Sequence, residues 1–177
     1  MTLGRVVAAA LTALATGLAL GTPSAQAAGP VTSTIYSPSA KVCVDVPGGT
    51  TDDNRNLVPA TCNGSAEQQF TFTPVHDANN TRPDTYVVVN RASGLCLFKF
   101  RFEIRQANCA GVSPYPAGWT WVLYPLDPAA HTYLFVPGYT TPAIGRCLAV
   151  GATTSLLPTP FCNAADPAQA FVVTGLS

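Results

Sequence analysis

The chain has 177 residues, a formal net charge of zero and 10% charged residues. A chain without excess charge has no global electrostatic attraction to nucleic acid or to membranes, so we expect neither as a partner. Sixteen prolines and fourteen glycines separate short apolar runs, which predicts many turns and few helices.

The N-terminal segment has the organisation of a secretory signal peptide. Arg5 is the only early charge, Val6–Leu20 is an uninterrupted stretch of small and mostly apolar residues, and Ala25 and Ala27 satisfy the small-residue rule for cleavage. We therefore predict a signal peptide over residues 1–27 and a secreted, extracellular protein. The apolar stretch is shorter than the roughly 20 residues that span a bilayer, so no membrane insertion is expected. The alanine-rich leader and the high proline and alanine content resemble those of an exported bacterial protein.

The mature chain, residues 28–177, is expected to be a single all-β domain. Aromatic and β-branched runs of strand length occur throughout it, and none has a helical period. The turn-rich segments between these runs are short enough to be loops inside one domain. The predicted strands are Phe70–Phe72, Tyr86–Val89, Trp119–Val122, Tyr133–Val136 and Phe171–Val173.

A pattern of two cysteines followed by an aromatic strand occurs three times in the mature chain. Its first cysteines, Cys43, Cys96 and Cys147, lie 53 and 51 residues apart. A fixed period near fifty residues indicates one structural unit copied three times, each copy burying its apolar face against the others. We place the repeats at about 31–80, 81–128 and 129–177.

An aromatic residue closes each copy of the pattern. Phe70, Trp119 and Phe171 are separated by 49 and 52 residues. Because they recur at the same place in each copy, we expect their side chains to meet in a shared core.

Six cysteines in an exported chain are expected to form disulfides, although the spacing of a single copy does not fix their pairing. If the three copies fold alike, each copy closes its own bridge. The predicted bridges are Cys43–Cys62, Cys96–Cys109 and Cys147–Cys162.

The sequence offers no metal site and little for catalysis. It has no C-x-x-C pair, and His76 and His131 lie in no ligand spacing, so we predict neither a metal nor another cofactor. A Ser-His-Asp hydrolase would need one of these two histidines, and the G-x-S-x-G sequence is absent. All cysteines are used by the predicted bridges, which disfavours a thiol nucleophile. We therefore expect a protein that is not an enzyme.

The three copies resemble the repeats of ricin B-type lectins. Each has a cysteine followed by apolar residues, a second cysteine and a closing aromatic, and the first copy has the full Cys-apolar-Asp-apolar start and Gln-x-aromatic end. The resemblance implies a β-trefoil of three repeats with one disulfide in each. It also implies a shallow sugar pocket in each repeat, in which an aspartate binds sugar hydroxyls, a glutamine supports it and an aromatic residue stacks on the sugar.

In the first repeat the resemblance assigns the sugar-binding aspartate to Asp45 and its supporting glutamine to Gln68. The stacking position holds Ala60 and a further polar position holds Val58, so only half of the pocket remains. Without an aromatic face, the desolvation of sugar hydroxyls is poorly compensated. Asp45 has a second interpretation, in which it caps the Pro47–Gly49 turn by accepting backbone N–H groups.

The second and third repeats depart further from the family pattern. The aspartate position holds Phe98 and Ala149, and the stacking position holds Ala107 and Pro160. The comparison implies that these two repeats have lost their sugar pockets.

The segment Phe98–Arg105 alternates strictly between apolar and charged residues. The pattern predicts a surface strand with one face toward the core and one charged face in solvent. The alternative is a face that binds a partner, because Lys99, Arg101 and Arg105 are three of the eight basic residues that remain after Arg5 is removed. Such a face would suit an acidic protein surface or an anionic glycan.

Two functions follow from these patterns. The first is a secreted, non-catalytic, lectin-like module that binds carbohydrate weakly through the first repeat. The second is a trefoil that binds a secreted protein independently of sugar, as an adaptor or accessory subunit of an extracellular assembly or toxin, or as an inhibitor. Fold alone does not choose between them.

Overall fold

The computed structural model describes residues 29–75, 85–109, 118–138, 142–143, 145–151, 156–158 and 161–176. The predicted signal peptide, His76 and Pro160 lie outside these ranges. Within them the chain forms β-strands and short 3₁₀ turns and no α-helix, which confirms the all-β prediction. These residues also contain no helix long and apolar enough to cross a membrane.

The described strands are short and follow one another between residues 31 and 172. Their bounds are β1 Val31–Thr34, β2 Tyr36–Ser37, β3 Val42–Asp45, β4 Val58–Ala60, β5 Gln69–Pro74, β6 Thr85–Asn90, β7 Cys96–Phe100, β8 Glu103–Ala107, β9 Thr120–Asp127, β10 Thr132–Pro137, β11 Leu148–Val150, β12 Leu156–Pro158 and β13 Phe171–Val172. The three 3₁₀ turns are η1 Pro47–Gly49, η2 Ala66–Gln68 and η3 Pro167–Gln169.

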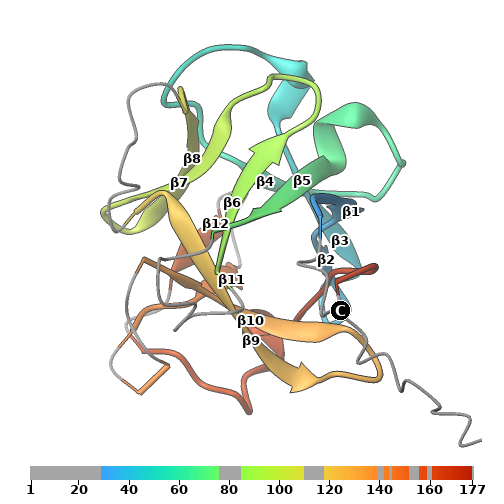
Figure 1. Cartoon of the computed structure of the whole chain (residues 1–177), viewed down its shortest axis with the longest axis vertical. Helices are drawn as coiled ribbons and strands as arrows, with labels where there is room; N and C mark the ends of the chain where they lie inside the picture. The colour runs from blue at the N-terminus through green and yellow to red at the C-terminus, as the bar shows by residue number, and fades with distance from the viewer. Residues whose placement is uncertain are drawn as a thin grey trace, which may run out of the picture.

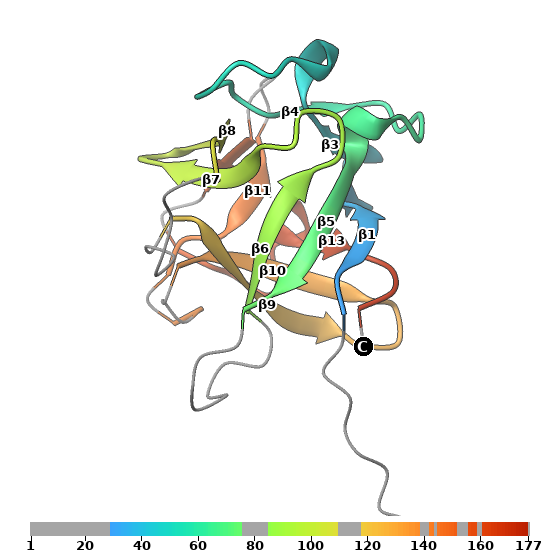
Figure 2. The same cartoon turned by 45° about the horizontal axis from the view of Figure 1, so that its top comes forward.

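Antiparallel pairing joins the strands into a threefold arrangement (Figure 1). The main sheet runs β1-β5-β6-β9-β10-β13-β2-β3-β4, and β7 pairs with both β6 and β8. Each repeat contributes one hairpin next to its first cysteine, namely β3–β4, β7–β8 and β11–β12. In Figure 2 the β3–β4 and β7–β8 hairpins lie above the β9–β10 pair. This three-hairpin architecture confirms the predicted β-trefoil.

Each repeat closes its own disulfide, as predicted. The bridges are Cys43–Cys62, Cys96–Cys109 and Cys147–Cys162, with Cα–Cα distances of 5.1, 5.4 and 5.0 Å. They enclose loops with sequence separations of 19, 13 and 15 residues. In the chain-entropy account, loops of this size each stabilise the fold by about 3 kcal/mol.

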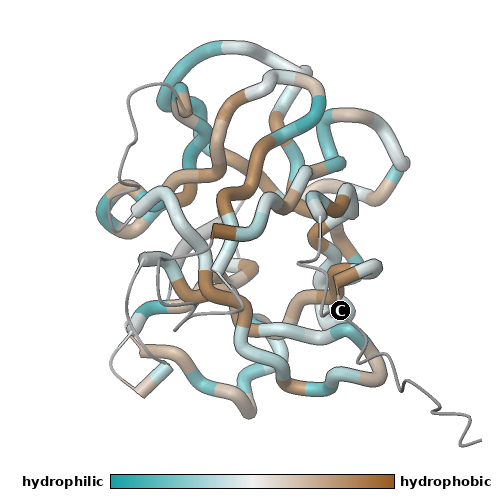
Figure 3. The backbone as a smooth tube through the Cα atoms, viewed as in Figure 1, coloured by the Kyte–Doolittle hydropathy of each residue, from teal (hydrophilic) through white to brown (hydrophobic). Residues whose placement is uncertain are grey.

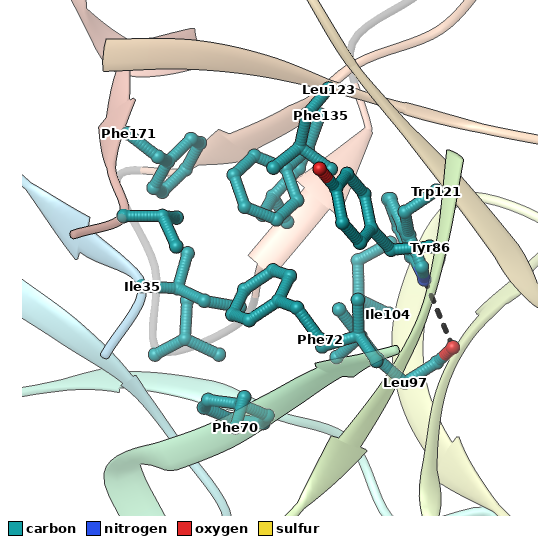
Figure 4. Close-up of a cluster of buried hydrophobic side chains, with 14 of the residues drawn as sticks. Ile35, Phe70, Phe72, Tyr86, Leu97, Ile104, Trp121, Leu123, Phe135 and Phe171 are labelled. Carbon is teal, nitrogen blue, oxygen red and sulfur yellow. Dashed lines mark hydrogen bonds between the residues drawn. The ribbon is translucent and has the colours of Figure 1, made fainter. Parts of the chain in front are cut away.

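The core is built from side chains of all three repeats (Figure 4). Phe70, Trp121, Phe135 and Phe171 are all fully buried. The Phe135 ring lies 6.2 Å from Trp121 and 5.7 Å from Phe171, so it links rings from different repeats. In Figure 3 the hydrophobic segments run along inner strands, while hydrophilic segments concentrate in outer loops.

The core tryptophan of the second repeat is Trp121, so the prediction of Trp119 was wrong. The aromatic spacing becomes 121 − 70 = 51 and 171 − 121 = 50 residues, which is more regular than the spacing with Trp119. The chain from the second cysteine to the core aromatic is longer in repeat two: 121 − 109 = 12 residues, against 70 − 62 = 8 and 171 − 162 = 9. Because this loop is longer, the core aromatic residue lies two positions after the predicted Trp119.

Phe98–Arg105 forms a hairpin, β7–β8, so the prediction of a single amphipathic strand was wrong. The chain reverses at Arg101, which has a φ of 52°. The alternation continues through the turn, but the antiparallel register pairs an apolar position of one strand with a charged position of the other. Apolar residues of β7 therefore lie opposite charged residues of β8. One face of the hairpin carries the pairs Phe98↔Arg105 and Phe100↔Glu103, and the other carries Leu97↔Gln106 and Lys99↔Ile104.

Candidate functional site

Asp45 stands at the end of β3, where buried Gln68 orients its carboxylate. The Gln68 Nε2 group donates hydrogen bonds to Asp45 Oδ2 at 2.8 Å and to the Thr61 carbonyl at 2.9 Å. The Gln68 Oε1 atom accepts from the backbone N–H of Asn63 at 2.9 Å. Because Gln68 is fully buried and its amide is held at both ends, it fixes the carboxylate of half-buried Asp45.

The turn after Asp45 closes without the aspartate side chain. The Gly49 N–H donates to the Val46 carbonyl at 3.0 Å. Among the hydrogen bonds of the described residues, Asp45 accepts from Gln68 and from no backbone N–H of this turn. The capping interpretation of Asp45 was therefore wrong, and its Oδ1 atom has no partner among these hydrogen bonds.

A pocket of about 290 Å³ opens beside Asp45. Asp45, Gly48, Asn63, Ser65 and Glu67 line it, and we call it the repeat-one pocket. Its lining contains carboxylates, an amide and a hydroxyl but no aromatic ring. These groups can exchange hydrogen bonds with the hydroxyls of a sugar, but they provide no stacking surface.

Glu67 strengthens the acceptor character of the repeat-one pocket. A hydrogen bond with the Ser65 side chain, together with one from the backbone, holds the pKa of Glu67 below its ordinary value. Gly49, at a φ of 60°, packs against this side chain, since a Cβ atom there would lie 2.9 Å from Glu67 Oε1. The pocket therefore presents the carboxylate of Glu67 in its charged form near neutral pH.

The third repeat keeps the glutamine network but lacks the aspartate. Gln169 Nε2 donates to Asp166 Oδ2 at 3.1 Å, and its Oε1 accepts from the Asn163 N–H at 3.0 Å. Ala149 stands in the position of Asp45. The glutamine therefore has a structural role in both repeats, but it contacts the pocket-lining carboxylate of Asp45 in repeat one and the carboxylate of Asp166, which caps η3, in repeat three.

In the second repeat an aromatic pair replaces the aspartate and glutamine. Phe98 occupies the position of Asp45 and Trp119 occupies the position of Gln68, two residues before the core aromatic. Their ring centroids lie 4.5 Å apart with an interplanar angle of 33°. The polar contact of repeat one is thus an apolar contact here. The sequence contained a signal for this contact, because both positions are polar in repeat one and aromatic in repeat two.

The three basic residues of the predicted partner face do not share one face. Arg105 lies over the Phe100 ring at 4.6 Å, and Arg101 approaches the same ring at 5.5 Å. Arg105 also forms an ion pair with Glu103 at 2.6 Å. Lys99 is paired with Ile104, on the opposite face of the hairpin. The structure therefore brings together Arg101 and Arg105 and separates Lys99 from them.

Part of the sequence matches a known family, and the fold is similar to that of several solved structures. The family described as “Ricin-type beta-trefoil lectin domain-like” matches residues 22–98. The comparison with curated proteins found no significant sequence match. Among the described residues, no group of three or more His, Cys, Asp or Glu side chains gathers in a way that could hold a metal ion.

Several solved structures are similar over most of the chain. The designed threefold-symmetric protein ThreeFoil has a TM-score of 0.63 at 18% identity, covering 82% of this chain and 99% of its own. The Polyporus squamosus lectin, bound to a human-type influenza-binding epitope, has a TM-score of 0.58 at 13% identity, covering 82% of this chain and 49% of its own. SeviL bound to the asialo-GM1 saccharide has a TM-score of 0.57 at 11% identity, covering 82% of this chain and 98% of its own.

Proposed function

We propose that this chain is a secreted, non-catalytic module that binds carbohydrate through the repeat-one pocket, because residues 22–98 match the ricin-type β-trefoil lectin domain-like family and the fold is similar to those of lectins solved with bound saccharides. The observation that carries the proposal is the contact of 2.8 Å between Gln68 Nε2 and Asp45 Oδ2. This contact holds one carboxylate oxygen and leaves the other to accept hydrogen bonds from sugar hydroxyls. Carboxylate acceptors form the stronger class of hydrogen bonds, which favours a polyhydroxylated ligand.

The binding is expected to be weak. Sugars gain much of their affinity from aromatic surfaces that cover their C–H faces, and the lining of the repeat-one pocket has none. Hydrogen bonds alone must then compensate for the desolvation of the sugar hydroxyls. Secretion is supported by the signal-like leader and by three disulfides, which are typical of oxidising compartments.

The test is a glycan array with the mature protein, residues 28–177, and its Asp45→Asn variant. Asparagine keeps the size of the side chain and can still accept from Gln68, but it removes the charge that binds hydroxyls. We expect a loss of affinity of about tenfold or more for neutral glycans.

The matched control is Asp52→Asn, which removes the same charge from an exposed loop position outside the repeat-one pocket. It should leave binding unchanged. If neither the native protein nor the variants bind any neutral or acidic glycan, the proposal is contradicted and a sugar-independent protein partner is favoured.

A further inference from the structure

Two of the three exposed large hydrophobic residues in the described part of the chain lie on one hairpin. Phe100 is 36% exposed and Phe102 is 57% exposed, and both lie at the tip of β7–β8. The third exposed large hydrophobic residue, Phe161, precedes Cys162, whose N–H donates to the Gly145 carbonyl beside Arg146. Arg146 in turn lies 4.8 Å from the Phe102 ring. Such grouping of exposed aromatic residues marks binding surfaces in proteins.

Guanidinium groups surround these rings. Arg105 and Arg101 lie 4.6 and 5.5 Å from the centroid of Phe100, and Arg146 covers Phe102. Glu103 is the acidic residue among them and is paired with Arg105. Three arginines against one glutamate give this tip a local charge of 3 − 1 = +2, in a chain whose net charge is zero. Charge complementarity therefore favours an anionic ligand.

A pocket of about 270 Å³ lies at the same place. Its lining is Phe100, Arg101, Phe102, Glu103 and Arg105, and we call it the hairpin-tip pocket. Pockets for drug-sized ligands have volumes of about 300 to 1,000 Å³, so this pocket suits a single sugar ring. A stable protein interface would bury roughly 800 Å² on each side, far more than five residues at a hairpin tip supply.

The two arginines of the pocket have different tasks. Nε and Nη2 of Arg105 donate to Glu103 Oε2 at 3.1 and 2.6 Å, so the Arg105 guanidinium is already paired with a carboxylate of this protein. Arg101 is exposed, and within the described residues it has no ion pair. Its guanidinium is therefore available for a carboxylate from outside, which it can bind through two parallel hydrogen bonds.

We propose that the hairpin-tip pocket binds a carboxylate-bearing sugar, of the uronic or sialic acid class. Arg101 pairs with the sugar carboxylate, the exposed ring of Phe102 covers the apolar face of the sugar, and Glu103, held by Arg105, accepts from a hydroxyl. This extends the proposed function, because the ligand class is still a glycan. The hairpin-tip pocket supplies the aromatic surface that the repeat-one pocket lacks.

The experiment compares matched acidic and neutral glycans on the mature protein: sialylated oligosaccharides beside their desialylated forms, and polyuronates beside their carboxyl-reduced forms. The variants are Arg101→Asn and Phe102→Ala. Asparagine tolerates the positive φ of 52° at position 101, and Phe102 is largely exposed, so both variants should fold. We expect each to weaken binding of the acidic glycans by about tenfold or more.

Lys41→Asn is the matched control. Lys41 is also exposed, basic and at a positive φ, of 57°, but it lies in the turn between β2 and β3. The Lys41→Asn variant should leave binding of acidic glycans unchanged. A further variant, Arg101→Lys, should bind them more weakly than the native protein because it lacks the planar guanidinium. An equal loss in Lys41→Asn and Arg101→Asn would overturn the proposal, since it would reveal only a general attraction between charges.

The Asp45→Asn variant separates this proposal from the proposed function. Acidic-glycan binding that survives Asp45→Asn but fails in Arg101→Asn supports the hairpin-tip pocket, whatever the result for neutral glycans. Glycan binding that fails in Asp45→Asn and survives in Arg101→Asn and Phe102→Ala overturns it and supports the repeat-one pocket alone. Binding of an acidic peptide, with no acidic glycan bound, also overturns it and assigns the hairpin to a protein partner.

Discussion

Gln68 and Gln169 are buried glutamines with the same structural role in two repeats. We propose that Gln68 has the additional role of orienting a ligand-binding carboxylate. Gln68 and Gln169 each receive the N–H of the asparagine that follows a second cysteine, Asn63 or Asn163. Gln68 also contacts the carboxylate of Asp45, which lines the repeat-one pocket, whereas Gln169 contacts that of Asp166, which caps η3. The two positions therefore form a natural pair for separating stability from binding.

We expect Gln68→Leu and Gln169→Leu each to lower the free energy of unfolding by about 1 to 3 kcal/mol, because each removes the several hydrogen bonds that the buried amide makes. Urea denaturation of both variants measures this change. Only Gln68→Leu should also weaken binding of neutral glycans, since Asp45 loses its orientation. An equal loss of glycan binding in Gln169→Leu would show that the effect of Gln68 is general destabilisation.

The β7–β8 hairpin replaces a polar contact with an aromatic one. Phe98 and Trp119 stack at 4.5 Å, in the places where repeat one has its aspartate and glutamine. The pair joins the middle of β7 to the residue just before β9. We infer that it fastens the hairpin to the body of the trefoil in place of the glutamine network.

A double-mutant cycle of Phe98→Ala and Trp119→Ala should give a coupling free energy of about 0.5 to 1.5 kcal/mol. Urea unfolding of the two single variants and the double variant provides the measurement. The control cycle pairs Trp119→Ala with Phe102→Ala, whose ring contacts Arg146 instead, and should give a smaller coupling. Equal coupling free energies in the two cycles would contradict the inference that the Phe98–Trp119 contact fastens the hairpin.

At the scale of the whole molecule, three bridges of similar loop length stabilise three equivalent hairpins. Their sequence separations of 19, 13 and 15 residues differ little in the entropy that they remove from the unfolded chain. We expect removal of any one bridge, by paired Cys→Ala substitution, to cost about 2 to 4 kcal/mol of unfolding free energy. Urea unfolding of the three paired variants measures the losses. A loss confined to one bridge would contradict the equivalence of the repeats.

The sequence predicted what depends on spacing along the chain. The recurrence of Cys43, Cys96 and Cys147 predicted three copies of one unit, and equivalence of the copies then predicted every bridge. The contact between Asp45 and Gln68 was predicted because their motif lies at fixed distances from the cysteines of repeat one, whereas their role in sugar binding stays a prediction. Such features are determined locally, since a repeated unit must place equivalent residues in equivalent surroundings.

Tertiary structure decided which side chains meet. Only the position of the turn at Arg101 showed that Phe98 and Phe100 share a face with Glu103 and Arg105, because a reversal changes the parity of an alternating pattern. The choice of Trp121 over Trp119 depended on the length of the preceding loop. Contacts between repeats, such as Arg146 on Phe102, leave no periodic signal because they join segments that are distant in the chain. The fold was therefore determined by the sequence pattern, whereas the surface that we propose for ligand binding was decided by three-dimensional packing.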